Sequence, residues 1–347
     1  MRPAETLELA PLADDLARVE DRLHESVRHP DRFLGEVASH LVAAGGKRIR
    51  PTLTLCAAYA ATNGTTPAPL VDAASGISSG NRQRSHPLPA SDDAVTGAVA
   101  VELVHLGSLY HDDVIDEAET RRGVPSVNAR WSNIVAILSG DYLLARASAL
   151  AASLGADVAG LLADTIGELC RGQVLELQHL YDVGRSEEDY QSTIEGKTAS
   201  LFATACRIGG MVSRVDEPTL DALTRYGHHL GMCFQIVDDC LDLTATDEAL
   251  GKHAGQDLVE GIYTLPVIYA LEACTPLRGL LGAPLDPARL LEARTLAMSD
   301  GAVPTALDVA RDHATKAGEA LAGAESLDGD VTAGLRRLVD GLVSRDR

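Results

Sequence analysis

Aromatic side chains and positive charge are both scarce in this chain of 347 residues. Only 3% of the residues are aromatic, too few for the stacking surfaces with which single-strand nucleic-acid binders hold bases. Thirty basic side chains stand against fifty acidic ones, so the formal net charge is −20 at pH 7. Such a charge repels nucleic acids and anionic membranes. We therefore expect no nucleic-acid partner, and an anionic substrate would need metal ions between its charges and the carboxylates of the protein.

Paired cysteines and uninterrupted apolar runs are also missing. The six cysteines form no C-x-x-C pair, and none lies at zinc-finger spacing from a histidine, so we expect small core residues in a reducing compartment. The first twenty residues are acidic and lack the apolar segment of a signal peptide. The most apolar long stretch, 143–163, is interrupted by Arg146 and Asp157. These absences predict a cytoplasmic protein with no integral membrane segment.

Alanine and leucine are abundant instead, and strand-forming residues are few, which favours helices. Asp216, with Pro218 behind it, predicts a helix start. The hydrophobic periodicity predicts helices over 12–28, 31–44, 50–62, 93–118, 131–153, 156–180, 186–211, 217–245, 256–273, 287–298, 303–322 and 329–343. The sequence therefore predicts an all-α protein folded as a single domain over 1–347. The segment 62–93 is rich in Ser, Gly, Pro and Asn, and we expect a flexible surface loop insertion there.

An acidic motif, HDDVIDE, occupies residues 111–117 at the end of a strongly apolar segment. Residues four apart lie on one face of a helix, so Asp112 and Asp116 share a face. Two carboxylates one turn apart repel each other, and a divalent cation between them would remove the repulsion. Oxygen ligands of this kind suit Mg²⁺, which completes its shell with water and substrate phosphates.

A second motif of the same D-D-x-x-D spacing, DDCLD, occupies residues 238–242 at the end of another apolar segment. Either motif alone is typical of a solvated acidic helix surface. Two copies, each ending an otherwise apolar helix, indicate two carboxylate clusters that face each other across a cleft and hold several Mg²⁺ ions around one polyphosphate.

Clusters of cations accompany the acidic motifs. Residues 45–51, GGKRIRP, place Lys47 and Arg50 on a glycine-led turn whose backbone amides are able to bind a diphosphate. Such a cluster taken alone is more often a solvated loop. Arg121 and Arg122 follow the first motif by five residues, and Lys197-Thr198 and Lys252 add further cations. Cations beside aspartate motifs in an acidic chain indicate a site for a metal–diphosphate complex.

Five segments together resemble the trans-type isoprenyl diphosphate synthases of the polyprenyl synthetase family. They are GGKRIRP, HDDVIDEAETRRG, GKTASLF, FQIVDDCLD and GKHAGQD, they occur in the family's order, and the resemblance extends over about 35–271. It implies an all-α isoprenoid synthase-type bundle around a central cavity, usually a homodimer. It also implies a Mg²⁺-dependent prenyltransferase that joins isopentenyl diphosphate to an allylic diphosphate (geranyl, farnesyl or geranylgeranyl).

The resemblance also assigns roles to residues. Those expected at metal ions are Asp112, Asp116 and Asp238, with Asp113 in support and Asp239 and Asp242 acting partly through water. Those expected on the allylic diphosphate are Arg121, Lys197 and Lys252. Those expected on isopentenyl diphosphate are Lys47, Arg50, His105 and Arg122. Thr198 and Gln235 are expected beside the reacting carbons.

Two histidines near the first motif and one departure from the family pattern also bear on the site. His105 lies two turns before Asp112 and is expected at the substrate, although a lone histidine on an apolar helix is more often a core residue. His111 is expected to orient a motif carboxylate. The sequence departs from the resemblance at Ile262, where a lysine is frequent, which removes one phosphate contact.

The length of the product should depend on the cavity floor before Asp112. Val104, Gly107 and Ser108 lie one to two turns towards the apolar end of the same helix. In the family a bulky residue there stops chain growth early, so the small pair Gly107 and Ser108 predicts a product longer than C20. The alternative for Gly107 is close packing of two helices.

Two other functions are considered beside the polyprenyl synthase. A class I terpene cyclase shares the fold, but it does not need the cation set of Lys47, Arg50 and His105. A non-catalytic subunit of a heteromeric synthase typically loses aspartate motifs, and both motifs are intact here.

Overall fold

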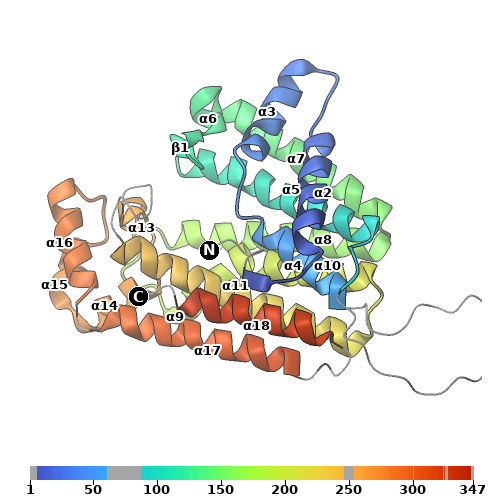
Figure 1. The fold of residues 1–347 in the computed structure, drawn as a ribbon. Coiled ribbons are helices and arrows are strands. Elements are labelled where there is room, and N and C mark those ends of the chain that lie inside the picture. The colour runs from blue at the N-terminus through green and yellow to red at the C-terminus, as the bar shows by residue number, and fades with distance from the viewer. Residues whose placement is uncertain are drawn as a thin grey trace, which may run out of the picture.

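The computed structural model describes residues 6–60, 87–245, 254–299, 301–322, 324 and 327–344. Within them the predicted all-α fold is confirmed (Figure 1). The helices are α2 (Leu12–Ser26), α3 (Arg32–Ala43), α4 (Ile49–Tyr59), α5 (Asp92–Ile115), α6 (Val127–Arg130), α7 (Asn133–Ser153), α8 (Ala156–Gln178), α9 (Glu187–Ile194), α10 (Ser200–Val212), α11 (Glu217–Thr244), α13 (Gln256–Glu260), α14 (Leu265–Ala273), α15 (Thr275–Leu280), α16 (Pro287–Ala297), α17 (Ala302–Ala322) and α18 (Gly329–Val343). A π-helical turn (Glu195–Ala199) joins α9 to α10, and the strands described are β1 (Thr120–Arg121) and β2 (Val124–Pro125).

Helix α5 forms the centre of the bundle. Every residue from Ala98 to Leu103 is at most 2% exposed, which is expected of a helix that is apolar on all sides. It lies along α7 and also contacts α4 and α10, while α11 lies between α10 and α17. Ser91 caps the start of α5, and Asp216 caps α11 as predicted, since each side chain accepts a hydrogen bond from a first-turn amide. Helices α5 and α11 carry the two acidic motifs at their C-terminal ends.

Two predicted helices are interrupted in the structure. The segment predicted over 186–211 contains the π-helical turn Glu195–Ala199, whose extra residue changes the direction of the side chains there. The segment predicted over 256–273 breaks at Gly261, which has a φ of 78° and ends α13. A new helix starts at Leu265 with Pro266 in its first turn. Both interruptions occur at the cavity described below.

The predicted loop at 62–93 falls mostly outside the described residues, which omit 61–86. Residues 87–91 have no regular secondary structure, and α5 begins at Asp92, one residue before the predicted end of the loop. Helix α7 has an apolar composition. By length and composition α7 is able to cross a membrane, the only such helix in the described part of the chain, although core helices of soluble proteins pass the same test.

Candidate active site

A cavity of about 810 Å³ opens between the ends of α5 and α11, the ends that adjoin β1 and α13 in Figure 1. Asp116 of the first motif and Asp239 of the second both line it. Arg121 of β1, Lys197 of the π-helical turn and Glu176 of α8 also line it. The structure therefore brings the two D-D-x-x-D motifs together around one space, which we call the acidic cavity.

A hairpin turn formed by Arg122 and Gly123 directs the side chains of the adjacent Arg121 and Arg122 to different partners. Arg122 and Gly123 have φ values of 53° and 77°, the pair of positive angles that a tight type I′ turn requires. Arg121 Nε donates to Asp113 at 2.6 Å, and its Nη2 lies 4.0 Å from Asp116. Arg122 instead donates to the carbonyl oxygen of Gly45. The turn thus supplies one arginine to the acidic cavity and the next to a different site.

The first motif combines burial with mutual repulsion. Burial raises the pKa of Asp112 to about 6, with repulsion from Asp116 adding to it and the nearby Lys197 opposing it. Burial also raises the pKa of Asp113 despite its bond to Arg121. Asp113 Oδ2 is buried and has no hydrogen-bond partner among the described residues. Carboxylates in this condition are stabilised by an added cation.

The second motif is held in a line of hydrogen bonds. Thr198 Oγ1 donates to Gln235 Oε1 at 2.7 Å, and Gln235 Nε2 donates to Asp239 Oδ1 at 2.7 Å. Tyr190 Oη donates to the other oxygen of Asp239 at 2.6 Å. Burial still raises the pKa of Asp239 to about 7, with Asp238 adding repulsion. Asp238 is exposed, whereas both oxygens of the buried Asp239 accept hydrogen bonds within this network.

Asp242, the last carboxylate of this motif, is buried and bonded to the following loop. Its carbonyl accepts from Gly255 N at 2.8 Å, and its Oδ2 accepts from Asp257 N at 3.2 Å. The motif therefore also anchors the start of α13.

Lys197 reaches the cavity from the π-helical turn and pairs with Glu176. Burial alone would lower the pKa of Lys197, but Glu176 and Asp112 together raise it. The turn lies against α8 so closely that a Cβ atom on Gly172 would lie 2.2 Å from Lys197 N. Only glycine permits this approach, and it sets Lys197 above the carboxylate of Glu176.

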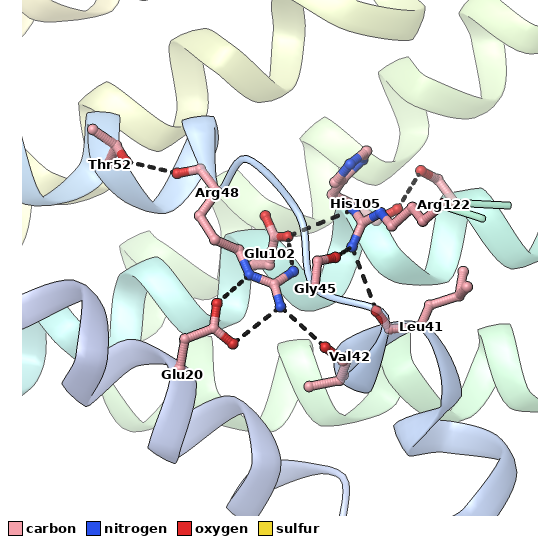
Figure 2. Close-up of polar contacts among 10 residues, drawn as sticks. Glu20, Leu41, Val42, Gly45, Arg48, Thr52, Glu102, His105 and Arg122 are labelled. Carbon is pink, nitrogen blue, oxygen red and sulfur yellow. Dashed lines mark hydrogen bonds and ion pairs between the residues drawn. The ribbon is translucent and has the colours of Figure 1, made fainter. Parts of the chain in front are cut away.

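A second charged site lies beside the start of α4, where Figure 2 shows Arg48, His105 and Arg122 around Glu102. Arg50 lies near His105 and Arg122, and we call these four cationic or basic residues the cation cluster. Arg48 is 5% exposed and has a φ of 48°. Its guanidinium donates to Glu20 at 2.5 Å and to Glu102 at 2.7 Å. Glu102 is 2% exposed and also lies 4.0 Å from Arg122 Nη2. The two glutamates neutralise Arg48, which makes it a structural cation.

Arg50 and His105 lack such partners. The guanidinium of Arg50 lies 4.8 Å from the centroid of the Phe202 ring, and its buried Nε has no hydrogen-bond partner among the described residues. Burial, with Arg122 nearby, lowers the pKa of Arg50 to about 10 even though Glu102 opposes it. Burial followed by Arg50 and Arg122 lowers the pKa of His105 well below its ordinary value. The cluster therefore holds more positive charge than its own carboxylates balance.

Other predicted residues take different places. Lys47 is exposed beside the cluster, and Lys252 lies outside the described residues. His111 does not orient a motif carboxylate, because its Nε2 lies 3.2 Å from the carbonyl oxygen of Ile137 and 3.4 Å from Asp141 of α7. That expectation is wrong because the helix turns the ring towards α7.

The three chain-length positions do not line the acidic cavity. Val104 and Gly107 are buried, and Ser108 donates to the carbonyl oxygen of His105 at 2.9 Å. A Cβ atom on Gly107 would lie 3.1 Å from the carbonyl oxygen of Gly140. Gly107 therefore permits close packing of α5 against α7, which was the alternative weighed for it, and its role in product length stays a prediction.

Sequence reasoning missed three residues that line the cavity: Glu176, Arg185 and Tyr190. Glu176 lies 21 residues before Lys197, and Tyr190 lies 49 residues before Asp239. A carboxylate, an arginine and a tyrosine at such separations carry no spacing signal, so packing alone brings them to the motifs.

The carboxylates of the cavity fit a divalent cation in their donor chemistry. The candidate ligands are all hard oxygen atoms, and Asp113 offers a buried oxygen without a partner among the described residues. Nowhere in the described ranges do three His, Cys, Asp or Glu side chains gather as they do around a fully protein-bound ion. This arrangement suits an ion such as Mg²⁺, which takes few protein ligands and completes its shell with water and phosphate oxygens.

The fold and the cavity define a class of protein, a helical synthase with paired aspartate motifs. The similarity of the chain to known proteins supports this class. The family model described as "Polyprenyl synthetase" matches residues 31–285. The chain is 39% identical to a nonaprenyl diphosphate synthase of Mycobacterium tuberculosis over 335 residues, 95% of this chain and 92% of that protein. It is 43% identical to heptaprenyl diphosphate synthase component 2 of Geobacillus stearothermophilus over 75% of this chain and 73% of that protein.

A solved structure shares the fold. The polyprenyl synthase of Caulobacter crescentus CB15, complexed with calcium and isoprenyl diphosphate, has a TM-score of 0.84 and 32% identity over 100% of this chain and 98% of that one. The chain belongs to the polyprenyl synthetase family. The predictions of a trans-isoprenyl diphosphate synthase and of the isoprenoid synthase-type helical bundle are therefore confirmed.

Proposed function

We propose that the chain condenses isopentenyl diphosphate with an allylic diphosphate to make a trans-polyprenyl diphosphate longer than C20. One observation carries the proposal: the protein holds two charged sites of opposite character. The acidic cavity has carboxylates from both D-D-x-x-D motifs, whereas the cation cluster has Arg50 and His105 without carboxylate partners in the described residues. A reaction of two diphosphates, one taken with metal ions and one without, needs this pair of sites.

The allylic diphosphate belongs in the acidic cavity. Asp112, Asp116 and Asp238 would hold Mg²⁺, which neutralises negative charge on the leaving group when it is bound. Arg121 and Lys197 line the same space and would donate to the phosphate oxygens, exchanging part of their contact with Asp113 and Glu176 for it.

Gln235 lines this cavity, and Thr198 donates a hydrogen bond to it. Their hydrogen-bonded line to Asp239 fixes the orientation of both side-chain oxygens. As the allylic carbon–oxygen bond breaks, positive charge develops on carbon, and these preorganised dipoles would stabilise it. The alkene of isopentenyl diphosphate forms the new carbon–carbon bond, and a proton is then lost to the departing pyrophosphate.

Isopentenyl diphosphate belongs at the cation cluster. Arg50 and His105 would donate to its phosphates, with Lys47 at the exposed side and Arg122 behind. His105 is neutral in the absence of an anion because burial lowers its pKa, so it would act as a hydrogen-bond donor rather than as a fixed charge.

Incorporation of labelled isopentenyl diphosphate tests the function. The purified chain is incubated with Mg²⁺ and with geranyl, farnesyl or geranylgeranyl diphosphate, and the products are separated by chromatography. We expect Mg²⁺-dependent products longer than C20 from at least one primer. A cyclised product without isopentenyl diphosphate would favour the terpene cyclase instead. No incorporation from any primer would defeat the proposal, and activity only after adding another subunit would favour the heteromeric alternative.

Product length is tested at Ser108. Ser108 is half-buried on α5, whereas Gly107 is buried and a side chain on it would press on the backbone of α7. We expect Ser108→Phe to shorten the product, and the conservative variant Ser108→Ala to leave it unchanged. An unchanged product in a folded, active Ser108→Phe variant would reject the floor hypothesis.

A homodimer is the assembly that we propose. Ile134 and Leu138 of α7 are 70% and 61% exposed, and Ile137 between them is also exposed. Val174 and Leu177 extend this apolar surface onto the neighbouring α8. Surfaces of this kind are interaction sites, and a second copy covering it explains why so apolar a helix as α7 is left exposed.

Light scattering during size-exclusion chromatography tests the dimer. We expect Leu138→Glu to yield monomers, and the equally exposed Leu88→Glu, away from this surface, to leave a dimer. A monomeric wild-type chain, or a dimeric Leu138→Glu variant, would contradict the proposed interface.

A further inference from the structure

Arg185 is a buried cation that lines the acidic cavity and belongs to none of the sequence motifs described above. It precedes α9, is 5% exposed and lines the cavity together with Ile262 and Thr264. Its loop is held in place, because Tyr181 N donates to the carbonyl oxygen of Gly261 at 2.8 Å. The fold therefore fixes the position of the guanidinium.

The guanidinium of Arg185 has hydrogen bonds only to neutral acceptors among the described residues. Nη1 donates to the carbonyl oxygen of Tyr263 at 3.1 Å, and Nη2 donates to Thr193 Oγ1 at 2.8 Å. Its Nε is buried without a partner there, and the Tyr190 ring lies 5.6 Å away. An arginine has five N–H groups, so more than half of them are left for another acceptor.

The other two described cations that line this cavity are already paired. Arg121 donates to Asp113, and Lys197 donates to Glu176. Arg185 forms no ion pair with any described residue, and burial lowers its pKa although Glu176, Asp239 and Asp189 attract it from a longer distance. Burying a charge without an ion-pair partner is costly, and an anion that enters the cavity reduces this cost.

We propose that Arg185 is a diphosphate-binding residue, which binds the pyrophosphate part of the allylic substrate and of the product from the side of the cavity that carries Ile262. This inference rests on the proposed function for the identity of the substrate, but not for the binding of pyrophosphate itself. Among the described residues, Arg185 would thus join Arg121 and Lys197 as a cation of this cavity.

Binding of inorganic pyrophosphate with Mg²⁺, measured by titration calorimetry, tests the inference without turnover. We expect Arg185→Met to weaken pyrophosphate binding about 10- to 100-fold, the range of a charge-assisted hydrogen bond. Arg185→Lys keeps the charge but loses the planar fork, so we expect a smaller loss, about 3- to 10-fold. In steady-state assays the KM for the allylic diphosphate should rise in the same order, with the KM for isopentenyl diphosphate unchanged.

Arg278→Met is the matched control. Arg278 donates to the carbonyl oxygen of Val183, so it anchors the same loop, but it does not line the cavity. We expect this variant to bind pyrophosphate like the wild type. Wild-type pyrophosphate affinity in folded Arg185→Met, or in Arg185→Lys if the methionine variant does not fold, would overturn the inference. Equal losses in Arg185→Met and Arg278→Met would overturn it too, because they indicate a role in loop structure only.

The two proposals fail in different ways. A wild-type chain that binds pyrophosphate through Arg185 but incorporates no isopentenyl diphosphate would defeat the proposed function alone. A wild-type chain that is active and binds pyrophosphate equally well without Arg185 would defeat this inference alone.

Discussion

The cation cluster and the acidic cavity are both partly buried and both charged, but their charges are balanced in different ways. In the cluster, Glu20 and Glu102 neutralise the structural Arg48 and leave Arg50 without a carboxylate in the described part of the chain. Among the described residues that line the cavity, carboxylates outnumber the cations, and the adjoining Asp113 keeps a buried oxygen without a described partner. In the function proposed above, the first site would take an anion alone and the second an anion that arrives with metal ions.

The comparison teaches that neighbouring residues of one motif serve opposite purposes. Arg48 and Arg50 are two residues apart, yet Arg48 forms ion pairs with two glutamates and Arg50 forms none with a described residue. Arg121 and Arg122 are adjacent, yet each belongs to a different site. Substitutions that remove one charge at a time distinguish a residue that stabilises the fold from one that binds a substrate.

The largest effect is expected from Asp112→Asn in the first acidic motif. Loss of this carboxylate removes a metal-binding oxygen and hence stabilisation of the leaving group, so kcat should fall about 10²- to 10³-fold. Steady-state kinetics over a range of Mg²⁺ concentrations measures it. Asp164→Asn, an exposed position on α8, is the control and should retain wild-type kcat. A kcat within twofold of wild type for Asp112→Asn would remove this carboxylate from the proposed site.

Arg48→Met should affect stability rather than chemistry. The variant leaves Glu102 buried with Arg122 4.0 Å away as its remaining cationic neighbour, and breaking a buried pair costs about 3–5 kcal/mol. Urea denaturation should show this loss in the free energy of unfolding. The exposed pair of Arg130 and Glu36 offers a control, since Arg130→Met should cost at most about 1 kcal/mol. Similar losses in the two variants would show that Arg48 is not the buried structural cation described here.

Arg50→Met should weaken the binding of isopentenyl diphosphate only. Removing this guanidinium should raise the KM for isopentenyl diphosphate about 10- to 100-fold, because a charge-assisted contact is lost. The KM for the allylic diphosphate should stay near the wild-type value, the opposite of the pattern expected for Arg185→Met. The exposed Arg225→Met on α11 serves as the control. An equal rise in both KM values would contradict two separate diphosphate sites.

The smallest effect is expected from a histidine pair outside both sites. His229 Nδ1 of α11 lies 3.1 Å from His313 Nδ1 of α17. Burial lowers the pKa of each ring to about 4, with His228 and Lys316 adding repulsion and Asp312 opposing it. The ordinary value is 6.5, so the unfolded chain binds more protons between about pH 4 and 6.5. Stability from this pair is complete above that range and is lost as the pH falls through it.

Thermal unfolding between pH 7.5 and 5 measures this dependence. We expect His313→Asn to flatten the fall in melting temperature relative to the wild type, and the exposed His24→Asn to leave it unchanged. Parallel pH profiles for wild type and His313→Asn would show that the pair contributes nothing to acid sensitivity.

Much of the fold was predictable from local patterns. The start of α11 at Asp216 and the positions of both acidic motifs at helix ends follow from capping and periodicity, which depend on residues a few positions apart. The interruption at Glu195–Ala199 was not predictable in this way. It is stabilised by the close approach of Gly172 from another helix, and such contacts leave no period in the sequence.

The sequence by itself determined the helices, the family and the two motifs that define the chemistry, because each rests on short-range spacing. Only the tertiary structure decided which buried cations have carboxylate partners and which do not. Arg48 and Arg185 are equally buried, but Glu20 and Glu102 pack against the first, while the second meets only neutral acceptors in the described residues. The cost of burying a charge depends on its neighbours in space, and those neighbours come from distant parts of the chain.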